Sequence, residues 1–142
     1  MSWLPKSSVV VPIDFSDESV EAVDTALEMV EGASHIHVIH VLPVLGATEV
    51  GLGWEVVDDD TMRGRAEKAI RERLAERKYE GFKIAIAFGD PGSEVAAFAE
   101  SIKADLIVIP SHGRTGLRHL LIGSVAERVC RLAHCPVLVL RN

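Results

Sequence analysis

The residues best suited to chemistry lie between an apolar segment and a helical pattern near the C-terminus. Residues 106–109 form an unbroken apolar run, which is typical of a strand buried on both faces. A loop containing Gly113 and Arg114 follows, and a helical pattern begins at Gly123-Ser124. The first N–H groups of a helix lack internal acceptors and attract anions, and glycine lets the backbone approach them closely. This arrangement predicts a phosphate-binding site.

The glycine spacing differs from the two common phosphate-binding motifs. No Gly-Lys-Ser/Thr sequence is present, and no G-x-G-x-x-G follows the first predicted strand. Nine residues separate Gly113 from Gly123, and Ser124 follows directly. This segment resembles the ATP-binding branch of the universal stress protein family, whose pattern is Gly, two residues, Gly, nine residues, then Gly-Ser or Gly-Thr. Pro110 replaces the first glycine, and proline has no N–H to donate and more bulk than glycine.

The resemblance covers essentially the whole chain and implies a small stress-response module that binds ATP, with Mg²⁺ or Mn²⁺ on the phosphates. In the family, the aspartate that matches Asp14 contacts the nucleoside, and the position of Val41 packs on adenine. Any hydrolysis should be slow, because no general base or pair of acidic metal ligands stands out. The implied nucleotide-binding residues are Pro12, Ile13, Asp14, Val41, Ile109, His112, Gly113, Arg114, Gly123, Ser124 and Val125.

Several of these residues also have simpler interpretations. Asp14 fits a turn or helix-cap aspartate, since Ser16 is a plausible N-cap for the helix that follows. Val41 fits a core valine, and both motif glycines fit tight turns. His112 has no partner carboxylate or nucleophile in the sequence, so contact with phosphate or solvent is favoured over catalysis.

The elements that would position these residues alternate between strand and helix along the chain. Strands are predicted at 8–13, 36–42, 83–88, 106–109 and 136–140. Helices are predicted from the Ser16 cap to Gly32, over 61–77, from an Asp90 cap with Pro91 at the first helical position, and over 124–133. Strands apolar on both faces favour one α/β domain over 1–142, with an open parallel sheet and helices on both sides. The family resemblance implies a Rossmann-like fold of the adenine nucleotide α-hydrolase type and strand order 3-2-1-4-5. The crevice would then lie between the first and fourth strands.

Composition limits the classes of partner. The chain has 142 residues and a net charge of −6, which argues against nucleic acid or an anionic membrane surface as the main partner. No apolar run approaches the roughly 20 residues of a membrane span, and no signal-peptide pattern begins the chain. A cytoplasmic location is expected. Cys130 and Cys135 are expected to be free thiols.

Two further features of the sequence bear on ligands. The acidic run 58–60 is expected to cap the next helix rather than hold a cation. The histidines have no spacing typical of metal ligands.

Three functions remain in competition at this point. The first is the ATP-binding regulatory module, and the second is a nucleotide-free dimeric interaction protein of the same family, favoured by Pro110. The third, an α/β enzyme acting on a phosphorylated substrate, lacks a catalytic constellation. The apolar strand near the C-terminus would leave an open edge. Because family members pair this strand across a two-fold axis, a homodimer through residues 137–140 is expected.

Overall fold

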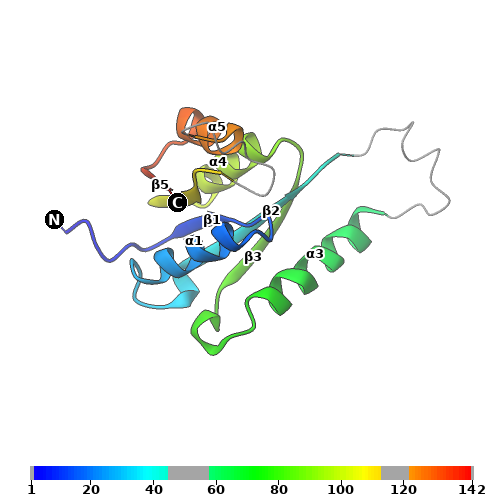
Figure 1. Cartoon of the computed structure of the whole chain (residues 1–142), viewed down its shortest axis with the longest axis horizontal. Helices are drawn as coiled ribbons and strands as arrows, with labels where there is room; N and C mark the ends of the chain where they lie inside the picture. The colour runs from blue at the N-terminus through cyan, green and yellow to red at the C-terminus, as the bar shows by residue number, and fades with distance from the viewer. Residues whose placement is uncertain (1, 45–57, 113–121, 142) are drawn as a thin grey trace.

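In the part of the chain that the structure describes, five parallel strands form the central sheet in the order β3-β2-β1-β4-β5 (Figure 1). They are β1 (Val9–Pro12), β2 (Ile36–Leu42), β3 (Lys83–Phe88), β4 (Leu106–Pro110) and β5 (Val137–Leu140). This computed structural model describes residues 2–44, 58–112 and 122–141. The predicted α/β fold and its strand order are confirmed.

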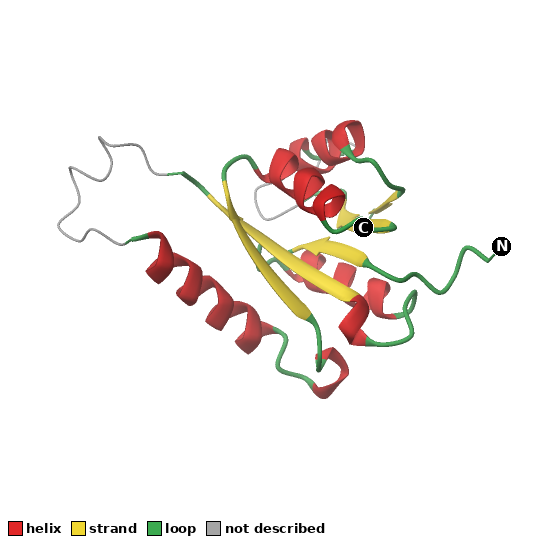
Figure 2. Cartoon of the chain, turned by 180° about the vertical axis from the view of Figure 1, so that it is seen from behind, coloured by secondary structure: helices red, strands yellow, loops and turns green. Residues whose placement is uncertain are grey.

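Helices cover both faces of the sheet. Helices α1 (Asp17–Leu27) and α3 (Asp59–Arg73) lie on one face, and α4 (Pro91–Ser101) and α5 (Ser124–Leu132) lie on the other (Figure 1). Figure 2 shows α3 running beside β3 at the outer side of the molecule. Two single-turn 3₁₀ helices, η1 (Ala33–His35) and η2 (Arg77–Tyr79), precede β2 and β3.

The sheet has a separate hydrophobic layer on each side, and β1 contributes to both. Val9 and Val11 pack beneath α1, whereas Val10 packs beneath α4 and α5, and all three side chains are fully buried. Successive side chains of a strand point to opposite faces, so a strand between two helical layers is apolar at every position. This arrangement explains the unbroken apolar runs of the sequence.

Three helices begin after capping residues that the sequence indicates, although α3 starts at Asp59 instead of the predicted residue 61. Ser16, Asp58 and Asp90 precede α1, α3 and α4, and each side chain accepts the backbone N–H of the residue three positions on. Pro91 occupies the first turn of α4. Hydrogen bonds from Thr61 lower the pKa of Asp58, because they stabilise the charged carboxylate. The acidic run therefore does cap the next helix.

Two predicted helix ends are wrong. Helix α1 ends at Leu27 instead of Gly32, because the N–H of Glu28 turns back to the carbonyls of Thr25 and Ala26 and closes the last turn. Helix α3 ends at Arg73 instead of 77. Leu74 leaves the helical conformation and buries its side chain in the core, and residues 77–79 form the separate turn η2.

Candidate functional site

The strand pairing locates the point where the sheet opens. Strand β1 pairs with β4 only at its start, through Val9↔Leu106 and Val10↔Ile107. Strand β4 stays paired with β5 as far as Pro110↔Leu140. The carboxyl ends of β1 and β4 are therefore neighbours that no longer share ladder hydrogen bonds. In an open parallel sheet this is the place where ligands bind, because the chain connections leave it in opposite directions.

Pro110 occupies a position in β4 where a proline breaks no ladder bond. The N–H of Ile107 donates to Pro136 at 3.0 Å, and the N–H of Ser111 donates to Leu140 at 2.7 Å. Successive N–H groups of a strand point to opposite neighbouring strands, so the nitrogen of Pro110 faces β1. It lies beyond Val10↔Ile107, the last pair that β1 and β4 form. Proline is tolerated in an inner strand at such a place. Its ring therefore points toward the opening between β1 and β4.

The carboxyl end of β1 continues into a tightly bonded turn around Asp14. Its Oδ1 accepts the N–H of Ser16 at 3.0 Å and the hydroxyl of Ser16 at 2.5 Å. The same hydroxyl oxygen accepts the N–H of Ser19 and thereby caps α1. The turn interpretation of Asp14 is thus confirmed. The turn also holds a half-buried carboxylate at the carboxyl edge of the sheet.

The other side of the opening is the start of α5. Gly123 is its N-cap, with no capping side chain, and its N–H donates to the Ser111 carbonyl at 2.5 Å. A Cβ on Gly123 would lie only 2.8 Å from that oxygen, so only glycine fits without movement. Ser124 and Val125 are exposed. The first N–H groups of a helix have no partner within the helix, which makes this exposed end a suitable anion site.

His112 lies against the same helix start. Its Nδ1 is shielded from solvent, and no group in the described ranges forms a hydrogen bond with it. A Cβ on Gly123 would lie 3.5 Å from this nitrogen. A shielded ring nitrogen without a partner is costly, and a bound phosphate oxygen would provide one.

The apolar residues that were predicted to bind the nucleotide lie on two different faces of the sheet. Val41 and Ile109 belong to the hydrophobic layer beneath α4 and α5, and the alternation of β1 places Pro12 on that face as well. Ile13 points to the opposite face and is buried beneath α1. Only the backbone of Ile13 is therefore available at the opening. Gly113 and Arg114 lie outside the described residues.

Two residues of this region were missed by sequence reasoning. The Nδ1 of His40, on β2, lies 2.7 Å from the Ile13 carbonyl oxygen. Phe15 has a φ of 67°, and its ring meets that of His40 edge-on at 4.9 Å. A bulky residue is rarely expected at positive φ, so no local signal marks Phe15 as a turn residue. His40 looks like any half-buried strand residue.

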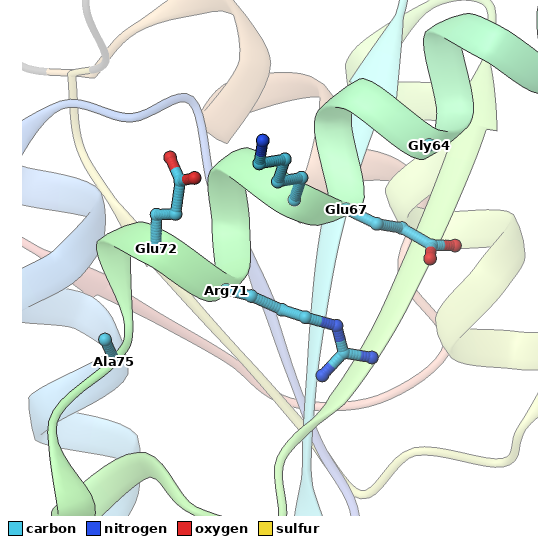
Figure 3. A pocket seen from close by; sticks show the side chains of 6 residues that line it. Gly64, Glu67, Arg71, Glu72 and Ala75 are labelled. Atoms are coloured by element: carbon cyan, nitrogen blue, oxygen red, sulfur yellow. The ribbon is translucent and has the colours of Figure 1, made fainter.

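Two hollows lie elsewhere on the surface and contain none of the predicted site residues. One, of about 440 Å³, follows the charged side of α3 between Gly64 and Ala75, where side chains such as Glu67 and Arg71 project from the helix (Figure 3). The other, of about 280 Å³, is lined by residues such as His134 and Cys135. Burial, with the nearby charge of Asp105, raises the pKa of the Cys135 thiol. This thiol is therefore a poor nucleophile at neutral pH.

The described residues contain no helix long and apolar enough to cross a membrane. Cys130 and Cys135 are both free thiols, as predicted.

Comparison with known proteins identifies relatives along nearly the whole chain. The model of the universal stress protein family matches residues 7–141. Universal stress protein MJ0531 of Methanocaldococcus jannaschii is 38% identical over 140 residues, covering 94% of this chain and 81% of the relative. Universal stress protein YxiE of Bacillus subtilis is 31% identical over 147 residues, covering 95% and 99%.

Solved structures share the fold. The structure of protein MJ0577 of Methanocaldococcus jannaschii superposes with a TM-score of 0.76 at 25% identity, covering 98% of each chain. A universal stress protein in complex with cAMP gives a TM-score of 0.67 at 23% identity, covering 96% and 97%. One from Archaeoglobus fulgidus in complex with dAMP gives 0.57 at 23% identity, covering 98% of each. With a family match over nearly all its length and relatives above 30% identity, this chain belongs to the universal stress protein family.

Proposed function

We propose that this protein is a regulatory module that binds ATP at the carboxyl edge of the sheet, between β1 and β4, with little or no turnover. The observation that carries the proposal is the start of α5. It begins with the exposed residues Ser124 and Val125 beside the opening in the sheet, and its N-cap, Gly123, has no side chain that could accept their N–H groups. That arrangement is suited to holding phosphate oxygens. Relatives of the same fold are described in complex with cAMP and with dAMP, which supports an adenine nucleotide.

Each part of the ligand has a proposed set of residues. The N–H groups at Ser124 and Val125, the hydroxyl of Ser124 and the ring of His112 would hold the phosphates, together with the backbone of Gly113 and the side chain of Arg114. Asp14 would hold the nucleoside, and the half-buried Val41 would pack on the adenine, whereas the side chain of Ile109 is buried beneath α4 and α5. A Mg²⁺ or Mn²⁺ ion would be carried in by the phosphates. These contacts position a ligand and provide no general base, so binding without efficient hydrolysis is expected.

The proposal is tested by titrating the protein with Mg-ATP in a calorimeter and repeating the titration with Asp14→Asn. Asparagine keeps one side-chain oxygen for Ser16 but loses the negative charge. Hydrogen bonds to charged groups contribute about 1.5–3 kcal/mol, so affinity should fall about tenfold or more. Asp17→Asn is the matched control, because Asp17 lies in the same segment with its side chain 88% exposed and paired with Arg73. Equal ATP affinity for the unaltered chain and both variants would contradict the role of Asp14.

Pro110 supports the alternative, a nucleotide-free dimeric interaction protein. Its ring points toward the opening, where the family's ATP-binding branch has a glycine, and it removes one backbone donor. The remaining donors at α5 favour nucleotide binding over this alternative. An unaltered chain that ignores Mg-ATP, with Pro110→Gly restoring binding, would establish the alternative.

We also propose that two copies pair through β5, the edge strand of the sheet. The carbonyl of Pro136 accepts the N–H of Ile107 in β4, and that of Leu140 accepts the N–H of Ser111, the residue after β4. The backbone groups of Val137 and Val139 therefore face the open edge. An open edge of four apolar residues favours pairing with a second strand. The proposed setting is the cytoplasm, which cell fractionation would test.

A further inference from the structure

The end of β1 is held to β2 by a side chain. The N–H of Ile13 donates to the Ile39 carbonyl at 2.8 Å, as in an ordinary ladder. The carbonyl of Ile13 lies 2.7 Å from Nδ1 of His40. A carbonyl oxygen can only accept, so Nδ1 carries the hydrogen in this bond. The imidazole of His40 thereby continues the strand contact at the residue where β1 gives way to the turn.

This bond fixes the peptide unit that leads into Asp14. The carbonyl of Ile13 and the N–H of Asp14 belong to one planar group. The carbonyl end is held by His40, and the N–H end lies 3.4 Å from the hydroxyl oxygen of Ser19. The orientation of this plane determines where the Asp14 side chain leaves the backbone. His40 therefore acts on the direction of the Asp14 carboxylate through the backbone.

The following residue adds a second link to the same ring. Phe15 adopts a φ of 67°, which is unfavourable for a bulky side chain and persists only where neighbours hold it. Its ring meets that of His40 edge-on, with centroids 4.9 Å apart and planes at 62°. This is a favourable aromatic geometry. One residue of β2 thus contacts the turn both before and after Asp14.

We propose that His40 is a positioning residue for the nucleoside end of the site, and that it gives the site its preference for a nucleotide over a bare polyphosphate. The inference rests on the proposed function, because Asp14 is there assigned to the nucleoside and α5 to the phosphates. His40 lies on β2 and holds the backbone before Asp14, whereas the start of α5 is bonded to Ser111 after β4. Loss of the His40 bond should therefore weaken nucleoside recognition and spare phosphate binding.

The test compares two substitutions that separate the hydrogen bond from the ring. His40→Phe keeps an aromatic ring against Phe15 and removes the donor. His40→Asn removes the ring and places an amide N–H near the position of Nδ1. His37→Phe is the matched control on the same strand. The His37 ring packs against Phe98 on the other side of the sheet, and burial lowers its pKa, so it is uncharged at neutral pH.

Each protein is titrated with Mg-ATP and with inorganic tripolyphosphate, and its unfolding is measured in urea. We expect His40→Phe to weaken ATP binding about tenfold while tripolyphosphate binding stays within about twofold. His40→Asn and His37→Phe should keep the ratio of the two affinities. A purely structural role would weaken both ligands together or alter only the urea midpoint.

The outcomes separate the inference from the function on which it rests. If the unaltered chain binds ATP no better than tripolyphosphate, the proposed nucleotide site fails, and the role of His40 fails with it. If the unaltered chain prefers ATP and folded His40→Phe keeps that preference, only the inference is overturned. Loss of the preference in His40→Asn with its retention in His40→Phe would also overturn it, because the ring and not the donor would then matter.

Discussion

Replacement of Gly123 by alanine tests the close contact between the start of α5 and the Ser111 carbonyl. The backbone of Gly123 is extended, with φ −76° and ψ 164°, so alanine is conformationally acceptable there. The difficulty is space, since the new Cβ would lie 2.8 Å from the Ser111 carbonyl oxygen and 3.5 Å from Cα and Nδ1 of His112. The nearest obstacle is backbone, which cannot rotate away as the end of a flexible side chain does.

The expected magnitude follows from this overlap. A carbon and a carbonyl oxygen ordinarily stay about 3.4 Å apart, so α5 must move by about half an ångström from the Ser111 carbonyl. Forcing an extra methyl group into a packed position costs about 1–3 kcal/mol. The movement also stretches the 2.5 Å bond between the Gly123 N–H and Ser111, and such bonds contribute about 1 kcal/mol net. We expect a total loss of about 2–3 kcal/mol in the free energy of unfolding.

Urea unfolding followed by circular dichroism measures this loss, and calorimetry with Mg-ATP measures the effect on the site. Because the displaced helix start carries the phosphate donors, ATP affinity should fall about tenfold. Gly64→Ala is the matched control, since nothing lies within 4 Å of the added Cβ in the middle of α3. It should stabilise the fold by about 0.5–1 kcal/mol. A loss below about 0.5 kcal/mol for Gly123→Ala, with unchanged ATP affinity, would refute the reasoning.

Three further predictions concern stability, the site and assembly. Burial and the hydrogen bond to Asp24, at 2.6 Å, raise the pKa of Tyr79 above its ordinary value of 10.0. The folded chain therefore keeps the phenol proton after the unfolded chain has lost it, and stability falls as pH rises through about 10. Tyr79→Phe should lower the free energy of unfolding by about 1 kcal/mol at pH 7 and reduce the loss of stability at alkaline pH. Urea titrations in which the free energy of unfolding falls with pH above about 9 as steeply as in the unaltered chain would contradict this. Pro110→Gly should tighten ATP binding by opening space and restoring a donor, and an unchanged dissociation constant in calorimetry would count against the ring as an obstacle. Light scattering should give twice the chain mass for the unaltered protein and the single chain mass for Val139→Pro, which lacks the outward N–H. A monomer before substitution would exclude pairing through β5.

Much of the fold could be predicted from local sequence, because its determinants are local. Strands buried on both faces have no polar positions, so the apolar runs at β1 and β4 reveal a parallel sheet between helices. Caps such as Ser16 and Asp90 act on residues three positions away and mark helix starts reliably. The strand order has no such local determinant, and its prediction came from family resemblance.

The features that sequence reasoning missed depend on contacts between distant segments. Glu28 and Leu74 end their helices by closing a turn and by burying a side chain, and neither residue is a typical helix breaker. The place of Pro110 in an inner strand is explained only by where the pairing of β1 and β4 stops. His40 bonds a carbonyl 27 residues away, and that bond follows from the register of β1 and β2. Such contacts leave no spacing pattern in the sequence.

The central claim is that the carboxyl edge between β1 and β4 holds an adenine nucleotide. The most direct measurement starts from protein purified without added nucleotide. Part of the sample is denatured, and any released small molecule is identified by mass spectrometry. The remainder is titrated with Mg-ATP. The account predicts an adenine nucleotide in equimolar amount, either released from the protein or taken up in the titration, and a clear loss of binding in Asp14→Asn. An empty protein that gives neither heat nor a thermal shift with Mg-ATP would contradict it.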